Sequence, residues 1–138
     1  MTNNILRYIK LIQKSLSKDL LKSEYRELND TNPFFGHCYV ATEALYHLLD
    51  NENSDFTPCC GRDDNDIVHW WLQNKKTKEI LDVTSEQYHL VGKFPPYEKG
   101  KGTGFLTKSP SKRATILIDR VKSKLAVDDA TREKFEME

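Results

Sequence analysis

The chain has 138 residues, with 21 basic and 21 acidic side chains and a hydrophobic fraction of 38%. A chain of this length can bury its own core, and a formal net charge of zero gives no global field that attracts nucleic acid or a membrane surface. No run reaches the roughly 18 apolar residues that a membrane span needs, and an odd number of cysteines argues against a disulfide framework. We therefore expect a single cytoplasmic domain over residues 1–138.

Apolar periodicity predicts helices and a small sheet in chain order. The predicted helices cover 4–21, 37–50 and 110–125. Strands are predicted over 67–72 and 79–83, and a short run at 56–60 precedes them. Thr84 and Gln87 resemble the capping box of a short helix after the last strand. This order predicts an α+β fold, in which helices pack on a short antiparallel sheet.

A basic segment extends from Lys93 to Lys124, where nine Lys and Arg residues accompany only two acidic residues. Its Gly/Pro-rich part, 90–108, is predicted to be a loop that ends at a helix N-terminus suited to anions. The spacing GxxxxGK[ST] is absent, which disfavours a nucleotide-binding loop. A loop beside the active cleft and a solvated basic loop remain the two interpretations. The candidate anion-binding residues are Lys99, Lys101, Lys108, Lys112 and Arg113.

Cys38 is the first candidate catalytic residue. It follows the turn NPFFG and opens a predicted helix, where free backbone N–H groups and the helix dipole stabilise a thiolate, the reactive form of cysteine. Gly36 leaves room for a substrate near the sulfur, and Asn32 and the Cys38 backbone N–H are candidate donors to an oxyanion. The alternatives are that Cys38 is a small core residue and that Asn32 belongs to an ordinary Asn-Pro turn.

His69 and Asp82 are predicted to meet across a hairpin. If the turn centres on residues 75–76, the two residues lie directly opposite each other, with Cβ atoms about 4.5–5.5 Å apart. The carboxylate would then orient the imidazole, and the imidazole would take the thiol proton. A lone histidine among apolar neighbours, satisfied within the core, is the alternative.

The pattern NP-x-x-G-x-C, followed by HWW and LDVTSEQY, resembles the uncharacterised YunG-like family of bacteria and their phages, over residues 30–88. More broadly, it is similar to the papain-like and transglutaminase-like thiol enzymes. In papain-like enzymes an amide side chain six residues before the Cys serves the oxyanion hole, which implies that role for Asn32. The YunG-like pattern has Gln directly before the Cys, where this chain has His37. The resemblance implies a small papain/transglutaminase-like domain with a catalytic triad of Cys38, His69 and Asp82.

These observations predict a cysteine-dependent acyl-transfer enzyme that acts on a protein or a small amide or acyl substrate and needs no cofactor. Cys59 and Cys60 are adjacent and lack the spacing of a zinc site, so no metal is predicted. One alternative is a non-catalytic binding module that holds an anionic ligand or blocks a protein partner through the cleft and the basic loop 93–113. Another is an interaction protein in which the three triad residues only pack. The candidate cleft residues are Gly36, His37, Trp70 and Trp71.

Overall fold

The computed structural model describes residues 2–21, 36–49, 55–105 and 108–136, with side chains described as far as residue 131. Its elements, in chain order, are α1 (Asn3–Ser15), the 3-10 turn η1 (Lys18–Leu20), α3 (Cys38–Leu48), β1 (Phe56–Arg62), β2 (Val68–Asn74), β3 (Ile80–Leu81), α4 (Glu86–His89), η2 (Tyr97–Lys99), β4 (Lys101–Gly102) and α5 (Lys112–Glu136). The predicted α+β class is confirmed, because the helices pack on an antiparallel sheet with the strand order β3-β2-β1-β4.

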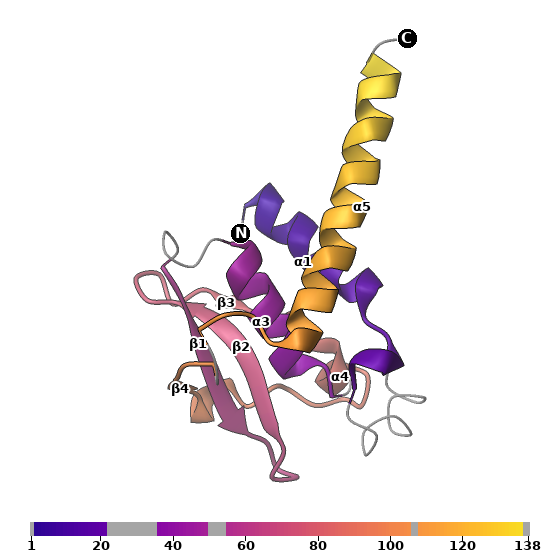
Figure 1. Cartoon of the computed structure of the whole chain (residues 1–138). Helices are drawn as coiled ribbons and strands as arrows, with labels where there is room; N and C mark the ends of the chain where they lie inside the picture. The colour runs from indigo at the N-terminus through magenta and orange to yellow at the C-terminus, as the bar shows by residue number, and fades with distance from the viewer. Residues whose placement is uncertain (1, 22–35, 50–54, 106–107, 137–138) are drawn as a thin grey trace.

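The core lies between one face of the sheet and the helices α1, α3 and α5, which gather on that side (Figure 1). The three helices contact one another, and α3 also contacts β2. Burying this apolar face is what holds the helices on the sheet. Fully buried members of the core are Ile12, Ala41, Ala44, Leu45, Leu72, Ala114, Leu117 and Val121.

The first helix is shorter than predicted, because α1 ends at Ser15 and Leu16 is extended. The last carbonyl groups of α1 have no further helical N–H groups to accept from, and two basic side chains of α5 donate to them instead. Arg120 donates to the Ser15 carbonyl at 3.1 Å, and Lys124 donates to the Lys14 carbonyl at 3.3 Å. The apolar periodicity continues past this break because Leu20, on the following 3-10 turn, also enters the core.

The last helix is longer than predicted. Instead of ending near residue 125, α5 continues to Glu136, and its C-terminal half projects beyond the rest of the domain (Figure 1). Arg7 of α1 supports the projecting part through ion pairs with Asp129 at 3.2 Å and Asp128 at 3.8 Å. Among the described residues, no helix combines the length and the apolar content needed to cross a membrane.

The hairpin between β2 and β3 differs in register from the prediction. Leu72 pairs with Leu81 and Gln73 with Ile80. This pairing places the centre of the hairpin one residue later than the predicted centre between residues 75 and 76. The Asn74 side chain causes the shift, because its Oδ1 accepts from the backbone N–H groups of Lys76 and Thr77 and so builds a four-residue loop. A centre displaced by one residue moves the pairing by two, which leaves every side chain on its predicted face.

Part of the predicted loop 90–108 has regular structure. The segment contains η2 and the short strand β4, which pairs with β1. The predicted capping box before it does not form: α4 begins after Ser85, and no cap hydrogen bond from a side chain is present. The Thr84 backbone N–H instead donates to Asp82 Oδ1 at 3.1 Å. Tertiary contacts with the sheet therefore decide the path of this segment.

Candidate active site

Cys38 is the first residue of α3, as the sequence predicts. The turn before it uses Gly36 at a positive φ of 82°, a conformation that favours glycine and directs the chain into the helix. At this position the Cys38 backbone N–H has no acceptor within the helix. The thiol is 8% exposed and lines a cavity of about 700 Å³.

The sulfur of Cys38 lies at the edge of the sheet, where β3 has already ended. Asn74 of β2 donates its backbone N–H to Glu79 on the β3 side. Because backbone groups alternate in direction along a strand, the carbonyl of Val68 points to that same side, beyond the last residue of β3. Cys38 Sγ donates to this carbonyl at 3.6 Å. The short edge strand thus gives the thiol a place beside His69, the next residue of β2.

His69 and Asp82 form a direct pair, as predicted. His69 Nε2 and Asp82 Oδ2 are 2.6 Å apart, and both side chains are almost completely buried, at 0% and 4% exposure. Asp82 lies just past the end of β3 and so is not directly opposite His69 in a strand pair. Both residues nevertheless share one face of the sheet, because the register shift preserves that face.

The Asp82 carboxylate fixes which nitrogen of the imidazole is available for chemistry. With Nε2 donating to Asp82, Nδ1 is the nitrogen that can accept a proton. Nδ1 is buried and makes no hydrogen bond of ordinary geometry with the described residues. On β2, the Cys38 sulfur lies 3.6 Å from the carbonyl oxygen of Val68, the residue directly before His69.

The pKa of His69 is strongly shifted. Burial lowers it, but the hydrogen bond with Asp82, the contact with Cys38 and the charges of both groups outweigh burial and raise it to about 9. A histidine with this pKa is an imidazolium at neutral pH. In papain-type chemistry, an imidazolium is the partner that holds a cysteine as the thiolate.

Tyr97 completes the surroundings of Asp82, and the sequence did not indicate it. Its hydroxyl donates to Asp82 Oδ2 at 2.7 Å, on the same oxygen that accepts from His69. Burial and the neighbouring Asp82 charge raise the pKa of Tyr97, so the hydroxyl stays protonated as a donor. No apolar periodicity and no sequence motif marks Tyr97. It reaches the site because η2 passes over the sheet.

Replacing Tyr97 with Phe is expected to lower the free energy of unfolding by about 1.5–3 kcal/mol, because a hydrogen bond to a buried carboxylate is lost. Urea unfolding followed by fluorescence measures this change. Tyr46→Phe is the matched control, since no hydrogen bond of the Tyr46 hydroxyl to a described residue is present, and we expect its cost to be below about 0.5 kcal/mol. Equal losses in the two variants would contradict the role of Tyr97 as a partner of Asp82.

The predicted cleft residues divide between the cavity and the interior. Gly36 and Trp70 line the cavity with Cys38. Trp71 does not line it: its side chain is 1% exposed and packs against the Tyr97 ring, with centroids 5.1 Å apart. His37 is also buried, and burial lowers its pKa to about 4, which makes it a neutral residue under the start of α3. Alternation along β2 separates the two tryptophans, since neighbouring residues point to opposite faces.

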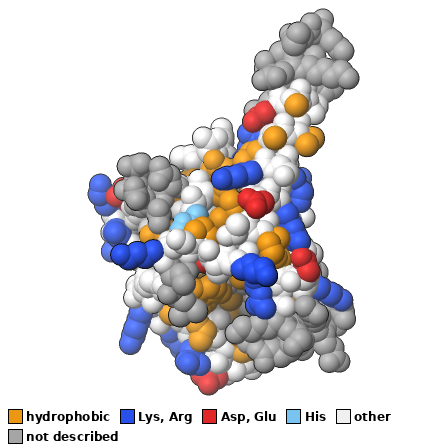
Figure 2. Space-filling model, in the orientation of Figure 1, with side chains coloured by type: hydrophobic (Ala, Val, Ile, Leu, Met, Phe, Trp, Pro, Cys, Tyr) orange, Lys and Arg blue, Asp and Glu red, His pale blue; other side chains and the backbone are white. Residues whose placement is uncertain are grey.

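Asn32, the predicted second oxyanion donor, lies outside the described residues. The predicted anion-binding residues do not form one group. Lys112 and Arg113 line the Cys38 cavity, whereas Lys101 lies on β4 at the opposite edge of the sheet and Lys108 is exposed. Figure 2 likewise shows Lys and Arg side chains spread over the face in view.

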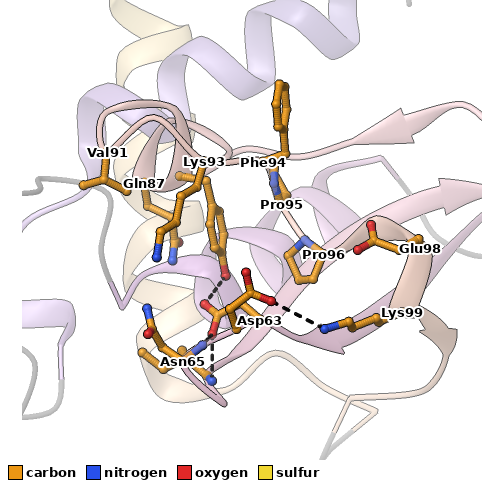
Figure 3. A pocket seen from close by; sticks show the side chains of 13 residues that line it. Asp63, Asn65, Gln87, Val91, Lys93, Phe94, Pro95, Pro96, Glu98 and Lys99 are labelled. Carbon is orange, nitrogen blue, oxygen red and sulfur yellow. Dashed lines mark hydrogen bonds and ion pairs between the residues drawn. The ribbon is translucent and has the colours of Figure 1, made fainter.

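A second cavity, of about 500 Å³, lies between the β1–β2 turn and the segment that leads into η2 (Figure 3). Tyr88 lines this cavity and donates its hydroxyl to Asp63 Oδ2 at 2.8 Å, while its ring meets the His69 ring edge-on with centroids 4.8 Å apart. Lys99 lines this second cavity, where its Nζ lies 3.6 Å from Asp64 Oδ1, and it does not line the Cys38 cavity. Among the described residues, no cluster of three potential metal ligands is present in this or any other region.

The other two cysteines provide internal references for the reactivity of Cys38. Cys59 is buried, and burial, followed by the neighbouring Cys60, raises the pKa of its thiol. Cys60 is half-buried on the same strand. Neither residue lines the Cys38 cavity.

Comparison with protein-family models, with curated proteins and with solved structures finds no match to this chain.

Proposed function

We propose that the protein is a cysteine-dependent acyl-transfer enzyme with a catalytic triad of Cys38, His69 and Asp82, of the papain-like or transglutaminase-like type that the YunG-like pattern resembles. The 2.6 Å pair of His69 Nε2 with Asp82 Oδ2 supports this most strongly, because it leaves Nδ1 for a thiol at a helix start that lines a cavity. A nucleophile, a base and a group that orients the base are the elements that this chemistry needs.

In the proposed reaction, His69 holds the proton of Cys38, and the thiolate attacks the carbonyl carbon of an amide or ester. The Cys38 backbone N–H donates to the resulting oxyanion, and the imidazolium protonates the leaving group as its bond to carbon breaks. The thioester that remains is then cleaved by water or by an amine, which gives its proton back to His69. Asp82 keeps the ring oriented throughout, and Tyr97 holds Asp82.

Alkylation by iodoacetamide at pH 6 tests the proposal, with each cysteine followed by peptide mass spectrometry. We expect Cys38 to react at least about ten-fold faster than Cys60, because an ordinary thiol is almost wholly protonated at that pH whereas one paired with an imidazolium is ionised. His69→Ala is expected to remove most of this advantage. It should leave the rate of Cys60 unchanged.

Equal rates for Cys38 and Cys60 in the folded wild-type protein would reject the catalytic proposal. A folded His69→Ala variant that keeps the fast reaction of Cys38 would reject the assigned role of His69. Circular dichroism of each variant distinguishes these results from unfolding, in which all three cysteines become reactive together.

A non-catalytic binding module is the second candidate, favoured by the presence of Lys112 and Arg113 in the lining of the same cavity. In this role the cavity holds an anionic ligand, and Cys38 reacts like an ordinary thiol. The labelling experiment separates the two candidates, because only the enzyme requires an activated Cys38.

A further inference from the structure

The cavity that contains Cys38 has a basic wall. Lys112 and Arg113, at the start of α5, line it together with Arg62. Arg62 is paired, since its guanidinium lies 3.4 Å from the Asp66 carboxylate and 3.2 Å from the Asp66 carbonyl oxygen. Lys112 and Arg113 make no ion pair with any described residue. The wall therefore carries two positive charges that the described part of the protein does not neutralise.

The position of this basic wall is fixed relative to the thiol. Glu43, which is fully buried on α3, accepts from the Ser111 backbone N–H at 2.9 Å and from the Ser111 hydroxyl at 2.7 Å. Ser111 directly precedes Lys112, and Glu43 follows Cys38 by five residues on the same helix. These two hydrogen bonds join the start of α5 to the helix that carries Cys38, so the backbone that bears Lys112 and Arg113 is held beside the cavity.

The remaining lining includes an aromatic surface. The Tyr39 and Trp70 rings meet edge-on with centroids 4.7 Å apart, and both line the cavity. A volume of about 700 Å³ lies within the range of small-ligand sites, which combine an apolar wall with a few polar groups. An apolar surface beside two cations that no described residue neutralises fits a ligand that has an apolar part and a negative charge.

We propose that the Cys38 cavity accepts an acyl donor that carries a negatively charged group, with Lys112 and Arg113 as the residues that recognise this charge. This inference rests on the proposed acyl-transfer function and specifies its substrate class. The thiolate forms a C–S bond with the acyl carbon, the bond to the leaving group breaks, and His69 supplies the proton to that group. Lys112 and Arg113 hold the charge of the acyl part, and the apolar part packs on Tyr39 and Trp70.

Two alkylating reagents of similar size test this proposal: iodoacetate is anionic and iodoacetamide is neutral. Each forms a C–S bond with the thiolate and releases iodide. The measured quantity is the ratio of the iodoacetate rate to the iodoacetamide rate at Cys38, at pH 7 and low salt. We expect Lys112→Gln/Arg113→Gln to lower this ratio by about five-fold, because two cations that attract the anionic reagent are removed. In the wild type, 0.5 M NaCl should lower the ratio in the same direction.

Lys99→Gln/Lys101→Gln is the matched control, since it removes the same charge from the other cavity and from β4. Its ratio is expected to stay at the wild-type value. A ratio that is unchanged in Lys112→Gln/Arg113→Gln, or one that falls equally in both variants, would overturn the proposal. Failure of the acyl-transfer function itself gives a different result: iodoacetamide, the neutral reagent, then shows no preference for Cys38. That result would overturn both the acyl-transfer function and the anionic substrate class.

Discussion

Replacing Asp82 with Ala is expected to lower the free energy of unfolding at pH 6 by about 3–5 kcal/mol, because it removes one partner of a buried ion pair. Asp82 accepts hydrogen bonds from His69, from Tyr97 and from the backbone N–H of Thr84. All three donors lose their acceptor in the variant, and His69 is left buried without the Asp82 carboxylate. Urea unfolding at pH 6 measures the loss.

The pH dependence of stability supplies a second and more specific readout of the same variant. The pKa of His69 is about 9 in the folded protein and about 6.5 in the unfolded chain, so the folded state binds the proton more tightly. Its contribution to stability is complete below pH 6.5 and is lost as the pH rises through 9. Asp82→Ala removes the hydrogen bond and the charge of Asp82 that raise the pKa of His69 against burial, so the loss of stability between pH 6.5 and 9 should become much smaller.

Asp64→Ala is the control for the loss of a carboxylate. The Asp64 side chain is 87% exposed, and among the described residues it pairs only with Lys99, so we expect a change below about 0.5 kcal/mol and the same pH dependence as the wild type. The proposed pairing is wrong if Asp82→Ala retains the wild-type fall in stability between pH 6.5 and 9.

The second large effect is expected at Gly100, where Ala should cost about 2–3 kcal/mol because the space for a side chain is already filled. A Cβ at this position would lie 2.3 Å from Trp71 Cζ2 and 3.0 Å from the Tyr97 carbonyl oxygen. Trp71 is 1% exposed and is held in the interior, so the segment that carries Tyr97 must move instead. Urea unfolding measures the cost in stability.

Gly102→Ala is the matched control two residues later. The nearest atom to its added Cβ is Thr57 Cγ2, at 3.8 Å, which is an ordinary contact distance, and we expect a change below about 0.5 kcal/mol. The displacement of Tyr97 predicts a further difference: Gly100→Ala should also slow alkylation of Cys38 at pH 6, whereas Gly102→Ala should not. Equal behaviour of the two variants would show that the contact with Trp71 does not position Tyr97.

Local sequence patterns were sufficient for the elements near Cys38. The turn containing Gly36 and the helix that begins at Cys38 depend on φ preferences and on apolar residues a few positions apart, and both are present where they were expected. The shared face of His69 and Asp82 was also predictable, because alternation along a strand survives a register shift of two residues. The register itself was not, since the Asn74 side chain builds a four-residue loop whose centre lies one residue later than the expected centre.

The sequence by itself determined the α+β class, the thiol at a helix start and the face on which an imidazole and a carboxylate meet, because each follows from periodicity or from the conformations that single residues allow. Only the tertiary structure decided that Tyr97 holds Asp82, that Glu43 joins the start of α5 to α3, and which of the two tryptophans reaches the cavity. These contacts join residues 15 and 68 positions apart, or depend on which face of the sheet the helices cover. No local pattern encodes such contacts, since they form only when packing of the core brings distant segments together.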